Sequence, residues 1–312
     1  MRRFENILFA TQGLPGHSDA LAQAIMLAAN NRVPVKGLIA SPTFPDDLSE
    51  YQHAYESSLQ DSLNQSVIKT KNDVGLSDDE VLFPIEVQSS EQPAVCIIRH
   101  VLNNHNDLVI KEAEPITDGG DGFKAIDMTL LRKCPSPVWL HRPTSKPKQK
   151  RRVAVAIDPV ASTQEQHALA LRLLELSRSI ADSCDSRLHV ISCWQHYMEN
   201  YIDRNTWIKI EHEDVAKEVE EERVRHEEAL QALIDESGIK GSIVIHHLHG
   251  KADDQIPTCV RERDVDVLVM GTVARTGISG FVIGNTAENV LQSIHCSLVA
   301  LKPQGFKTPI AS

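Results

Sequence analysis

A glycine-containing loop in the second half of the chain has the residue types that bind phosphate. It reads GTVARTGISGFVIGNTAE over 271–288 and follows the apolar run DVLVMG. Gly271 allows a sharp turn and brings backbone N–H groups close to a ligand. Asn285 and Glu288 have the spacing of a capping pair, which predicts that a helix begins here. The positive end of that helix would attract phosphate oxygens, and Arg275 would add charge-assisted hydrogen bonds.

An acidic residue ends another apolar run of the same half. Asp158 closes RVAVAID at 152–158. Because ligands of open parallel sheets bind at the carboxyl ends of the strands, we expect Asp158 and the glycine loop at one edge of one sheet. A carboxylate there accepts hydrogen bonds from a ribose hydroxyl or an adenine amine. The residue chemistry alone leaves open a phosphate site and an ordinary surface loop.

Strand and helix patterns alternate along the chain and would position these residues. Apolar runs predict strands at 6–11, 33–40, 81–87, 107–111, 136–141, 152–158, 187–194, 242–248, 266–271 and 297–303. Helical spacing predicts helices at 18–30, 47–74, 92–104, 122–133, 162–182, 206–236 and 252–264, and from 285. Ser18 or Asp19 would cap the first helix. This alternation predicts parallel sheets with helices on both faces.

The two halves repeat one another. Lys111 aligns with Gly271 and Ser136 with Cys296, each pair 160 residues apart. A repeat of this length indicates a duplicated domain. The polar segment PTSKPKQK has the composition of a linker. We therefore predict domains at 1–142 and 151–303, a linker at 143–150 and a tail at 304–312, with the two domains paired like the halves of a symmetric dimer.

The composition limits which classes of partner the protein binds and indicates its cellular compartment. The formal net charge of −11 argues against strong electrostatic binding to nucleic acid or to an anionic membrane. No apolar run approaches the roughly 20 residues that span a bilayer. The six cysteines are scattered without a CxxC pair, as in a reducing compartment. The start, MRRFENILFA, is typical of a first strand and not of a signal peptide, so we expect a cytoplasmic protein.

Two further segments carry conspicuous side chains. His246, His247 and His249 cluster in IVIHHLHG, where only His247 and His249 would share a face of a strand. A metal site would need further ligands, so we expect solvated histidines at a strand end and no metal, with zinc as a side hypothesis. The acidic run at 211–230 has spaced apolar residues, which predicts an amphipathic helix with a solvated charged face.

The segments VAVAIDPV and DVLVMGTVARTGISGFVIGNTAENVLQSIHCSLVALKP resemble the universal stress protein family. NDLVIKEAEPITDGGDGFKAIDMTLLRKCPSPVWLHRP resembles the degenerate first half of its tandem, E-type members, so the resemblance covers the whole chain. It implies two tandem Rossmann-like α/β domains of the adenine nucleotide alpha hydrolase type. Each would have a five-stranded parallel sheet, ordered 3-2-1-4-5, with helices on both faces. The last strands, around Val138–His141 and Leu298–Leu301, would meet at the sheet edges; a further homodimer stays open.

The resemblance also implies a nucleotide site. ATP-binding members of the family carry G-x2-G-x9-G-[ST] in this loop and an Asp after the first strand. Gly271, Gly284 and Asp158 match, whereas Ala274 replaces the second glycine and Asn285 the Ser/Thr. By resemblance, Asp158 would contact the adenosine part of ATP or another adenine nucleotide. The residues around the phosphates would be Gly271, Thr272, Val273, Ala274, Arg275, Gly284, Asn285 and Thr286. The two replacements leave a different phosphorylated ligand open.

The first half departs further from this pattern. Gln12 stands in the place of Asp158, and Lys111, Glu114, Lys124 and Ala125 stand in the places of Gly271, Ala274, Gly284 and Asn285. A glutamate in the loop would repel phosphate. We expect a structural domain or a partner surface, since a fold persists when its site is lost. The alternative is a different ligand held by Lys111 and Lys124.

No catalytic motif accompanies the predicted site. The chain has neither a GxxxxGK[ST] loop nor a GxSxG elbow, and no set of nucleophile, base and orienting group is visible. We expect a non-enzymatic stress-response protein that binds a nucleotide in its second domain. The alternatives are an interaction module with both sites vestigial and, third, a slow hydrolase.

Overall fold

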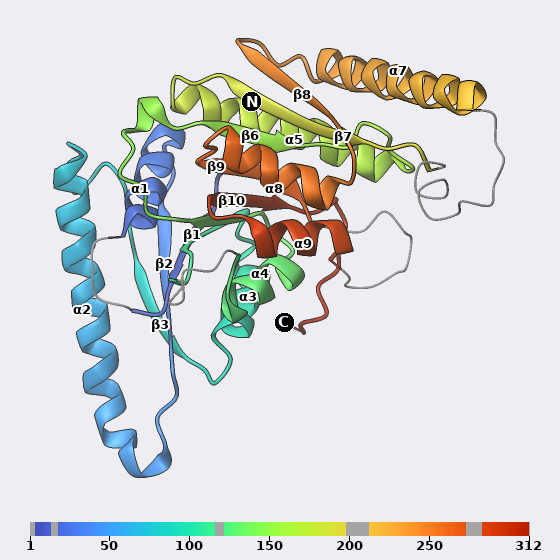
Figure 1. Ribbon diagram of the computed structural model, residues 1–312. Helices are drawn as coiled ribbons and strands as arrows, with labels where there is room; N and C mark the ends of the chain where they lie inside the picture. The colour runs from blue at the N-terminus through green and yellow to red at the C-terminus, as the bar shows by residue number, and fades with distance from the viewer. Residues whose placement is uncertain (1–3, 14–17, 116–121, 198–211, 273–282, 312) are drawn as a thin grey trace. The chain divides into compact units, whose positions relative to one another are not determined.

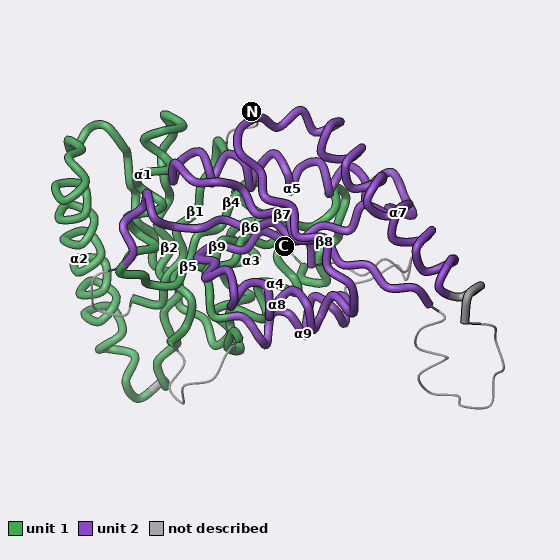
Figure 2. The backbone as a smooth tube through the Cα atoms, turned by 45° about the horizontal axis from the view of Figure 1, so that its top comes forward, with its two compact units in different colours: residues 1–145, 277–283, 295–312 green, residues 146–276, 284–294 purple. Residues whose placement is uncertain are grey.

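The computed structural model describes residues 4–13, 18–115, 122–197, 212–272 and 283–311 (Figure 1). Its strands and helices alternate as the sequence predicts. The chain divides into two compact units (Figure 2). Unit 1 comprises 1–145, 277–283 and 295–312, and unit 2 comprises 146–276 and 284–294. The division into domains at 1–142 and 151–303 stays a prediction.

Unit 1 is a sheet with helices on both faces. Its elements are β1 (Ile7–Thr11), α1 (Asp19–Asn31), β2 (Val35–Ser41), η1 (Asp46–Leu48), α2 (Ser49–Asp73), β3 (Ile85–Ser89), α3 (Pro93–Asn104), β4 (Leu108–Glu112), α4 (Ala125–Lys133), β5 (Val138–His141) and β10 (Ser297–Leu301). The strand order is β3-β2-β1-β4-β5-β10, and the first five strands are parallel. This confirms the predicted order 3-2-1-4-5 for the first copy.

Strand β10 closes unit 1 from the far end of the sequence. It pairs antiparallel with β5, with Leu298 opposite Leu140, Val299 opposite Trp139 and Ala300 opposite Val138. All six side chains are buried. The predicted meeting of the last strands is therefore confirmed. The edge of β5, which would otherwise offer unpaired N–H and C=O groups, is covered by β10.

Unit 2 repeats the same plan. Its elements are η2 (Lys148–Lys150), β6 (Val153–Ala156), α5 (Gln164–Ser183), β7 (Leu188–Trp194), α7 (His212–Ser237), β8 (Ile243–His249), α8 (Ala252–Glu262), β9 (Val267–Gly271) and α9 (Asn285–Ser293). The order β9-β6-β7-β8 is parallel throughout and corresponds to β4-β1-β2-β3 of unit 1. Helix α5 packs beside α7 and α8 beside α9, so helices cover both faces.

Local sequence explains where these elements begin and end. The Ser18 side chain accepts the Leu21 N–H at 3.2 Å and starts α1, as predicted. Every residue of β6 is buried, which accounts for its continuous apolar sequence. The strand predicted at 81–87 is shorter, because β3 begins only after Pro84, which has no N–H for the ladder. The first residues of the helix predicted at 206–236 lie outside the described residues; α7 begins at His212.

Candidate functional site

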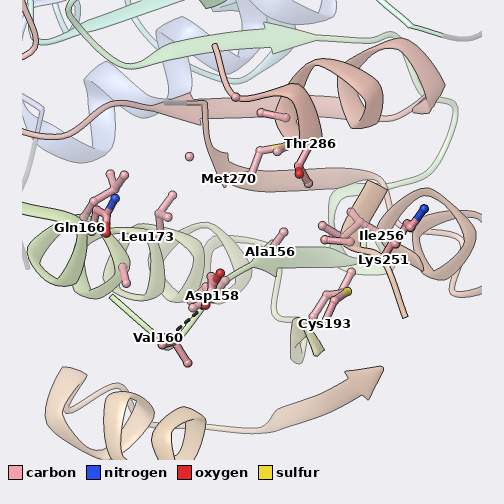
Figure 3. A pocket seen from close by; sticks show the side chains of 18 of the residues that line it. Ala156, Asp158, Val160, Gln166, Leu173, Cys193, Lys251, Ile256, Met270 and Thr286 are labelled. Carbon is pink, nitrogen blue, oxygen red and sulfur yellow. Dashed lines mark hydrogen bonds between the residues drawn. The ribbon is translucent and has the colours of Figure 1, made fainter. Parts of the chain in front are cut away.

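A pocket of about 560 Å³ opens in unit 2, within the size range of ligand sites. It lies where β6, β7 and β9 end and where α8 and α9 begin. Figure 3 shows Asp158, Cys193, Ile256, Met270 and Thr286 around it. The carboxyl ends of parallel strands are the place where ligands of doubly wound sheets bind. The pocket therefore lies where the fold predicts a ligand site.

Asp158 is held in place at the end of β6. Its Oδ1 atom accepts the Val160 N–H at 3.0 Å, which fixes the turn after the strand (Figure 3). The preceding residue, Ile157, donates its N–H to the Ile191 carbonyl at 2.9 Å and so continues the pairing with β7. The half-buried carboxylate of Asp158 lines the pocket. Its position is thus set by backbone on both sides.

The N-cap of helix α9 lies one residue before the cap that the sequence predicts, and the helix itself begins at Asn285. Gly284 is the N-cap, with an extended backbone (φ −66°, ψ 142°) and no side chain to cap the helix. Its N–H donates to the Thr272 carbonyl at 3.1 Å, and its carbonyl accepts the Glu288 N–H at 2.8 Å. The prediction of Asn285 as the cap is therefore wrong: Asn285 is already helical. The first N–H groups of α9 have no partner within the helix, and this turn lines the pocket.

The pocket brings together part of the predicted nucleotide site. Asp158, Gly271, Gly284, Asn285 and Thr286 line it. A methyl group on Gly271 would lie 3.1 Å from Leu169 Cδ2, so this glycine also permits close packing of β9 against α5. Thr272 is fully buried beside the pocket lining, and its Oγ1 has no hydrogen-bond partner in the part of the chain that the structure describes. The predicted residues Val273, Ala274 and Arg275 lie outside the described residues.

Several pocket residues were not predicted. The additional wall is formed by side chains from α5, from the end of β7, from α8 and from β9: Gln166, Leu173, Cys193, Gln195, Lys251, Ile256 and Met270. Cys193, Gln195 and Met270 could have been found from their place at the ends of predicted strands, whereas Gln166, Leu173 and Ile256 lie inside helices and carry no such signal. Burial raises the pKa of the Cys193 thiol to about 12, so this side chain is a neutral apolar wall and not a nucleophile at physiological pH.

In unit 1, the chain's own side chains fill the corresponding place. Lys111 Nζ lies 2.9 Å from Asp127 Oδ1, and both side chains are buried. The second oxygen of Asp127 accepts the Glu114 N–H at 2.7 Å, and the Glu114 carboxylate accepts the Ile126 N–H at 3.2 Å in the first turn of α4. Lys111 is therefore committed to an internal ion pair. This contradicts the alternative that Lys111 helps to hold a different ligand.

The histidine cluster also differs from expectation. His246 is buried, and its Nε2 lies 2.9 Å from His189 Nδ1. His247 Nε2 lies 2.9 Å from Nδ1 of His226, which is buried too. The prediction of solvated histidines is thus wrong for His246, which is buried beside β7. His247 is half-buried against α7, and His249 is exposed as predicted. Among the described residues, no group of three or more His, Cys, Asp and Glu side chains is placed to hold a metal ion.

The charged helix is confirmed. The described side chains of α7 place Leu230, Leu233 and Ile234 in the interior. Arg223 pairs with Glu220 and Glu227 on the outer face, each at 2.7 Å.

Within the described residues, no helix has the length and apolar character needed to cross a membrane.

Fold and pocket together define a tandem Rossmann-like α/β protein with a ligand-sized pocket in its second unit. The sequence pattern of the universal stress protein family matches residues 150–302. A universal stress protein E homolog of Haemophilus influenzae is 30% identical over 313 residues, covering 96% of this chain and 98% of the relative. The chain belongs to the universal stress protein family, and over nearly its whole length it is similar to this E-type relative.

Further comparisons agree with this membership. Universal stress protein E of Escherichia coli strain K12 is 30% identical over 237 residues, covering 73% of this chain and 71% of the relative. A functionally unknown protein from Pseudomonas aeruginosa PAO1 has a crystal structure that matches with a TM-score of 0.69 at 25% identity, covering 96% of this chain and 93% of that one. The family resemblance and the tandem fold predicted from the sequence are confirmed.

Proposed function

We propose that unit 2 binds an adenine nucleotide (ATP, ADP or AMP) or a similar phosphorylated ligand, and that the protein acts in the cytoplasm as a non-enzymatic stress-response protein. One observation carries the proposal. Asp158, Gly271 and the first turn of α9 come from separate parts of the sequence and line one pocket. Membership of the universal stress protein family supports the stress-response role.

Each wall of the pocket suits one part of such a ligand. The N-terminus of α9 supplies N–H groups and a positive dipole end for phosphate oxygens. Lys251, at the start of α8, adds a cation to the lining. Asp158 accepts hydrogen bonds from ribose hydroxyls, and Met270 and Ile256 offer apolar surface for a base. Asn285 keeps an amide donor at the position that the family fills with Ser or Thr.

We infer no chemical step at this pocket. The thiol in the described lining is not activated, since burial raises the pKa of Cys193 to about 12, and we assign Asp158 to ligand binding alone. Ligand binding would act by stabilising one state of unit 2, which stabilises the folded protein by mass action.

The first experiment identifies what co-purifies with the protein, by mass spectrometry of the ligand released on denaturation. Titration calorimetry with ATP, ADP and AMP then compares variants. Gly284→Glu places a carboxylate at the N-terminus of α9 and is expected to weaken binding by tenfold or more, about 1.4 kcal/mol or above. Gly284→Ala is the matched control, because φ at this position suits any residue. If Gly284→Glu bound these nucleotides as tightly as Gly284→Ala and the wild type, the site assignment would be wrong.

Asp158 supplies a second pair of variants. Asp158→Ala removes the carboxylate and also the acceptor for the Val160 N–H. Asp158→Asn keeps an oxygen acceptor for that turn but removes the negative charge. We expect Asp158→Ala to bind most weakly and Asp158→Asn to lie between it and the wild type. Wild-type affinity in both variants would exclude Asp158 as a ligand contact.

A second candidate function is an interaction module with both sites vestigial. The ion pair between Lys111 and Asp127 favours it, because unit 1 places paired side chains of its own at the position that corresponds to Gly271. The same mass-spectrometric experiment separates the two functions. A protein that is purified empty and that ATP, ADP and AMP fail to stabilise on heating would favour the interaction module.

A further inference from the structure

Two histidines join helix α7 to strand β8 within unit 2. His226 Nδ1 lies 2.9 Å from His247 Nε2. His226 is only 5% exposed. Trp194 of β7 stacks on the His247 ring, with the ring centroids 5.8 Å apart and the planes at 21°. The contact is therefore a hydrogen bond between a buried imidazole, His226, and a half-buried one, His247.

Such a bond depends on protonation. One imidazole donates an N–H, and the other accepts on a nitrogen that carries no proton. When both rings are protonated, each nitrogen carries a hydrogen, and two N–H groups of two cations face each other across 2.9 Å. No rotation of the side chains restores an acceptor, because an imidazolium has none. The doubly protonated pair must therefore separate.

The surroundings favour the neutral rings. Burial lowers the pKa of His226, and the charge of His247 lowers it further, whereas Glu222 on α7 raises it. Burial also lowers the pKa of His247, with Arg223 of α7 acting in the same direction and Glu227 in the opposite one. The neighbour from β7 is Trp194, which carries no charge. The folded state thus holds protons on this pair less readily than free histidine does.

Side chains hold α7 to the sheet at this point, because the backbone groups of a helix are used within it. The end of α7 has additional attachments: Leu230 and Leu233 are buried, and Glu236 accepts a hydrogen bond from His167 of α5 at 2.9 Å. Buried apolar side chains therefore hold the end of the helix independently of the His226–His247 pair. Glu218 of α7 also lies 3.9 Å from His196 Nε2, just after β7. Of these described attachments, the His226–His247 pair is the one that loses its hydrogen-bond acceptor when both rings carry a proton.

The second histidine pair of unit 2 behaves differently. His189 and His246 are also 2.9 Å apart, but they lie on the adjacent strands β7 and β8. These strands share a parallel ladder from Leu188 to Trp194, so backbone hydrogen bonds hold them together whatever the charge of the rings. This pair is a natural internal comparison for the first.

We propose that the His226–His247 pair is a proton-sensitive clasp, which holds the middle of α7 against β8 near neutral pH and releases it in mild acid. This is a second response of unit 2, separate from ligand binding in the pocket. Because the pKa of both rings is lowered in the folded state, the released state takes up more protons as the pH falls below that of free histidine, about 6.5. The clasp is therefore complete above that pH and is lost progressively as the pH falls through the lowered pKa values of the pair, when the second ring takes up its proton.

Hydrogen exchange of the full chain, followed by mass spectrometry, tests the clasp. Peptides over 216–230 are compared at about pH 7.5 and about pH 5.5, on either side of the histidine range, after correction for the intrinsic exchange rate. We expect exchange to be faster by about tenfold or more in acid, since each proton taken up contributes up to tenfold per pH unit. Equal corrected rates in the wild type would overturn the proposal.

A matched variant removes only the titration. In His226→Asn with His247→Gln, the amide groups take the positions of Nδ1 and Nε2 and keep a hydrogen bond that protons do not break. We expect this variant to exchange equally at both pH values, and His189→Asn with His246→Gln to respond like the wild type. A full acid response in the first variant would place the switch elsewhere and overturn the proposal.

One single variant keeps the test decisive if the double variant has already loosened α7 at neutral pH. In His247→Gln, a protonated His226 donates to the glutamine oxygen, so acid strengthens the contact instead of breaking it. The expected result is slower corrected exchange over 216–230 in acid than at neutral pH. Faster exchange in acid, as in the wild type, would contradict the clasp.

Discussion

At the scale of single residues, Lys111 and its aligned counterpart Gly271 show how one side chain changes what lies at the end of a strand. Its counterpart Gly271 leaves room at the end of β9, whereas Lys111 fills the end of β4 and pairs with Asp127 at 2.9 Å. The Asp127 carboxylate also accepts the Glu114 N–H at 2.7 Å. The interaction is internal, and both partners are buried. Unit 1 thus uses an ion pair where unit 2 has a pocket.

This pair yields a stability prediction. Asp127→Ala leaves the Lys111 cation buried without its counter-charge, which typically costs about 3–5 kcal/mol. The joint replacement Lys111→Met with Asp127→Leu removes both charges and is expected to cost far less, because well-packed apolar residues often replace a buried pair without loss. Urea unfolding of the three proteins measures both free energies. If the joint variant were as unstable as Asp127→Ala, packing and not charge would explain the loss.

Lys302 carries a prediction about pH. Its amine donates to the Leu131 carbonyl at 2.7 Å in a buried site, and burial lowers its pKa to about 8 from 10.5. Between these values the unfolded chain binds a proton that the folded protein does not. The contribution of Lys302 to the free energy of unfolding therefore rises with pH in this window, by at most about 1.4 kcal/mol per unit. The difference between wild type and Lys302→Met, measured by urea unfolding from about pH 7 to about pH 10, should change accordingly; a constant difference would contradict it.

At the scale of elements, periodicity predicted most strands and helices because each buries one continuous face or stripe. The apolar run at 153–156 is buried throughout in β6, and Leu230 and Leu233 mark the inner face of α7. The ends of the elements were harder to predict than their existence. The N-cap of α9 is Gly284, which has no side chain to cap the helix. The sequence rule looks for a capping side chain followed by Glu three residues later, and it therefore selected Asn285 with Glu288.

Contacts between elements set the limit of the sequence analysis. Asp158 was found because it ends a strand, and it does line the pocket. Cys193 and Lys251 line it as well, yet nothing in their local sequence distinguishes them from ordinary strand-end residues. The bond between His226 and His247 joins a helix to a strand across a distance in sequence that periodicity does not address. Such pairs follow from packing and become visible only in the folded structure.

At the scale of the whole molecule, the duplication is more than two copies in series. The last strand of the chain, β10, belongs to unit 1 and covers the edge of β5, so the sheet of the first copy is completed by residues from the end of the second. Leu298, Val299 and Ala300 are buried in that pairing. Unit 1 therefore depends on a strand that duplication placed far away in sequence.

This dependence predicts that residues 1–150 alone are deficient. Without β10, the fragment exposes Val138, Trp139 and Leu140 along an unpaired strand edge, the arrangement that favours aggregation. We expect the fragment to be less soluble than the full chain and to unfold at a lower urea concentration than unit 1 does there. Trp139 fluorescence follows the unfolding of unit 1. In the full-length reference protein, Trp194 and Trp207 are replaced by Phe so that only Trp139 reports. A synthetic peptide of residues 295–312 should restore much of the loss, and a peptide with Val299→Asp should not, because it would bury a charge opposite Trp139. A fragment as stable as the reference without any peptide would show that β10 is dispensable to unit 1.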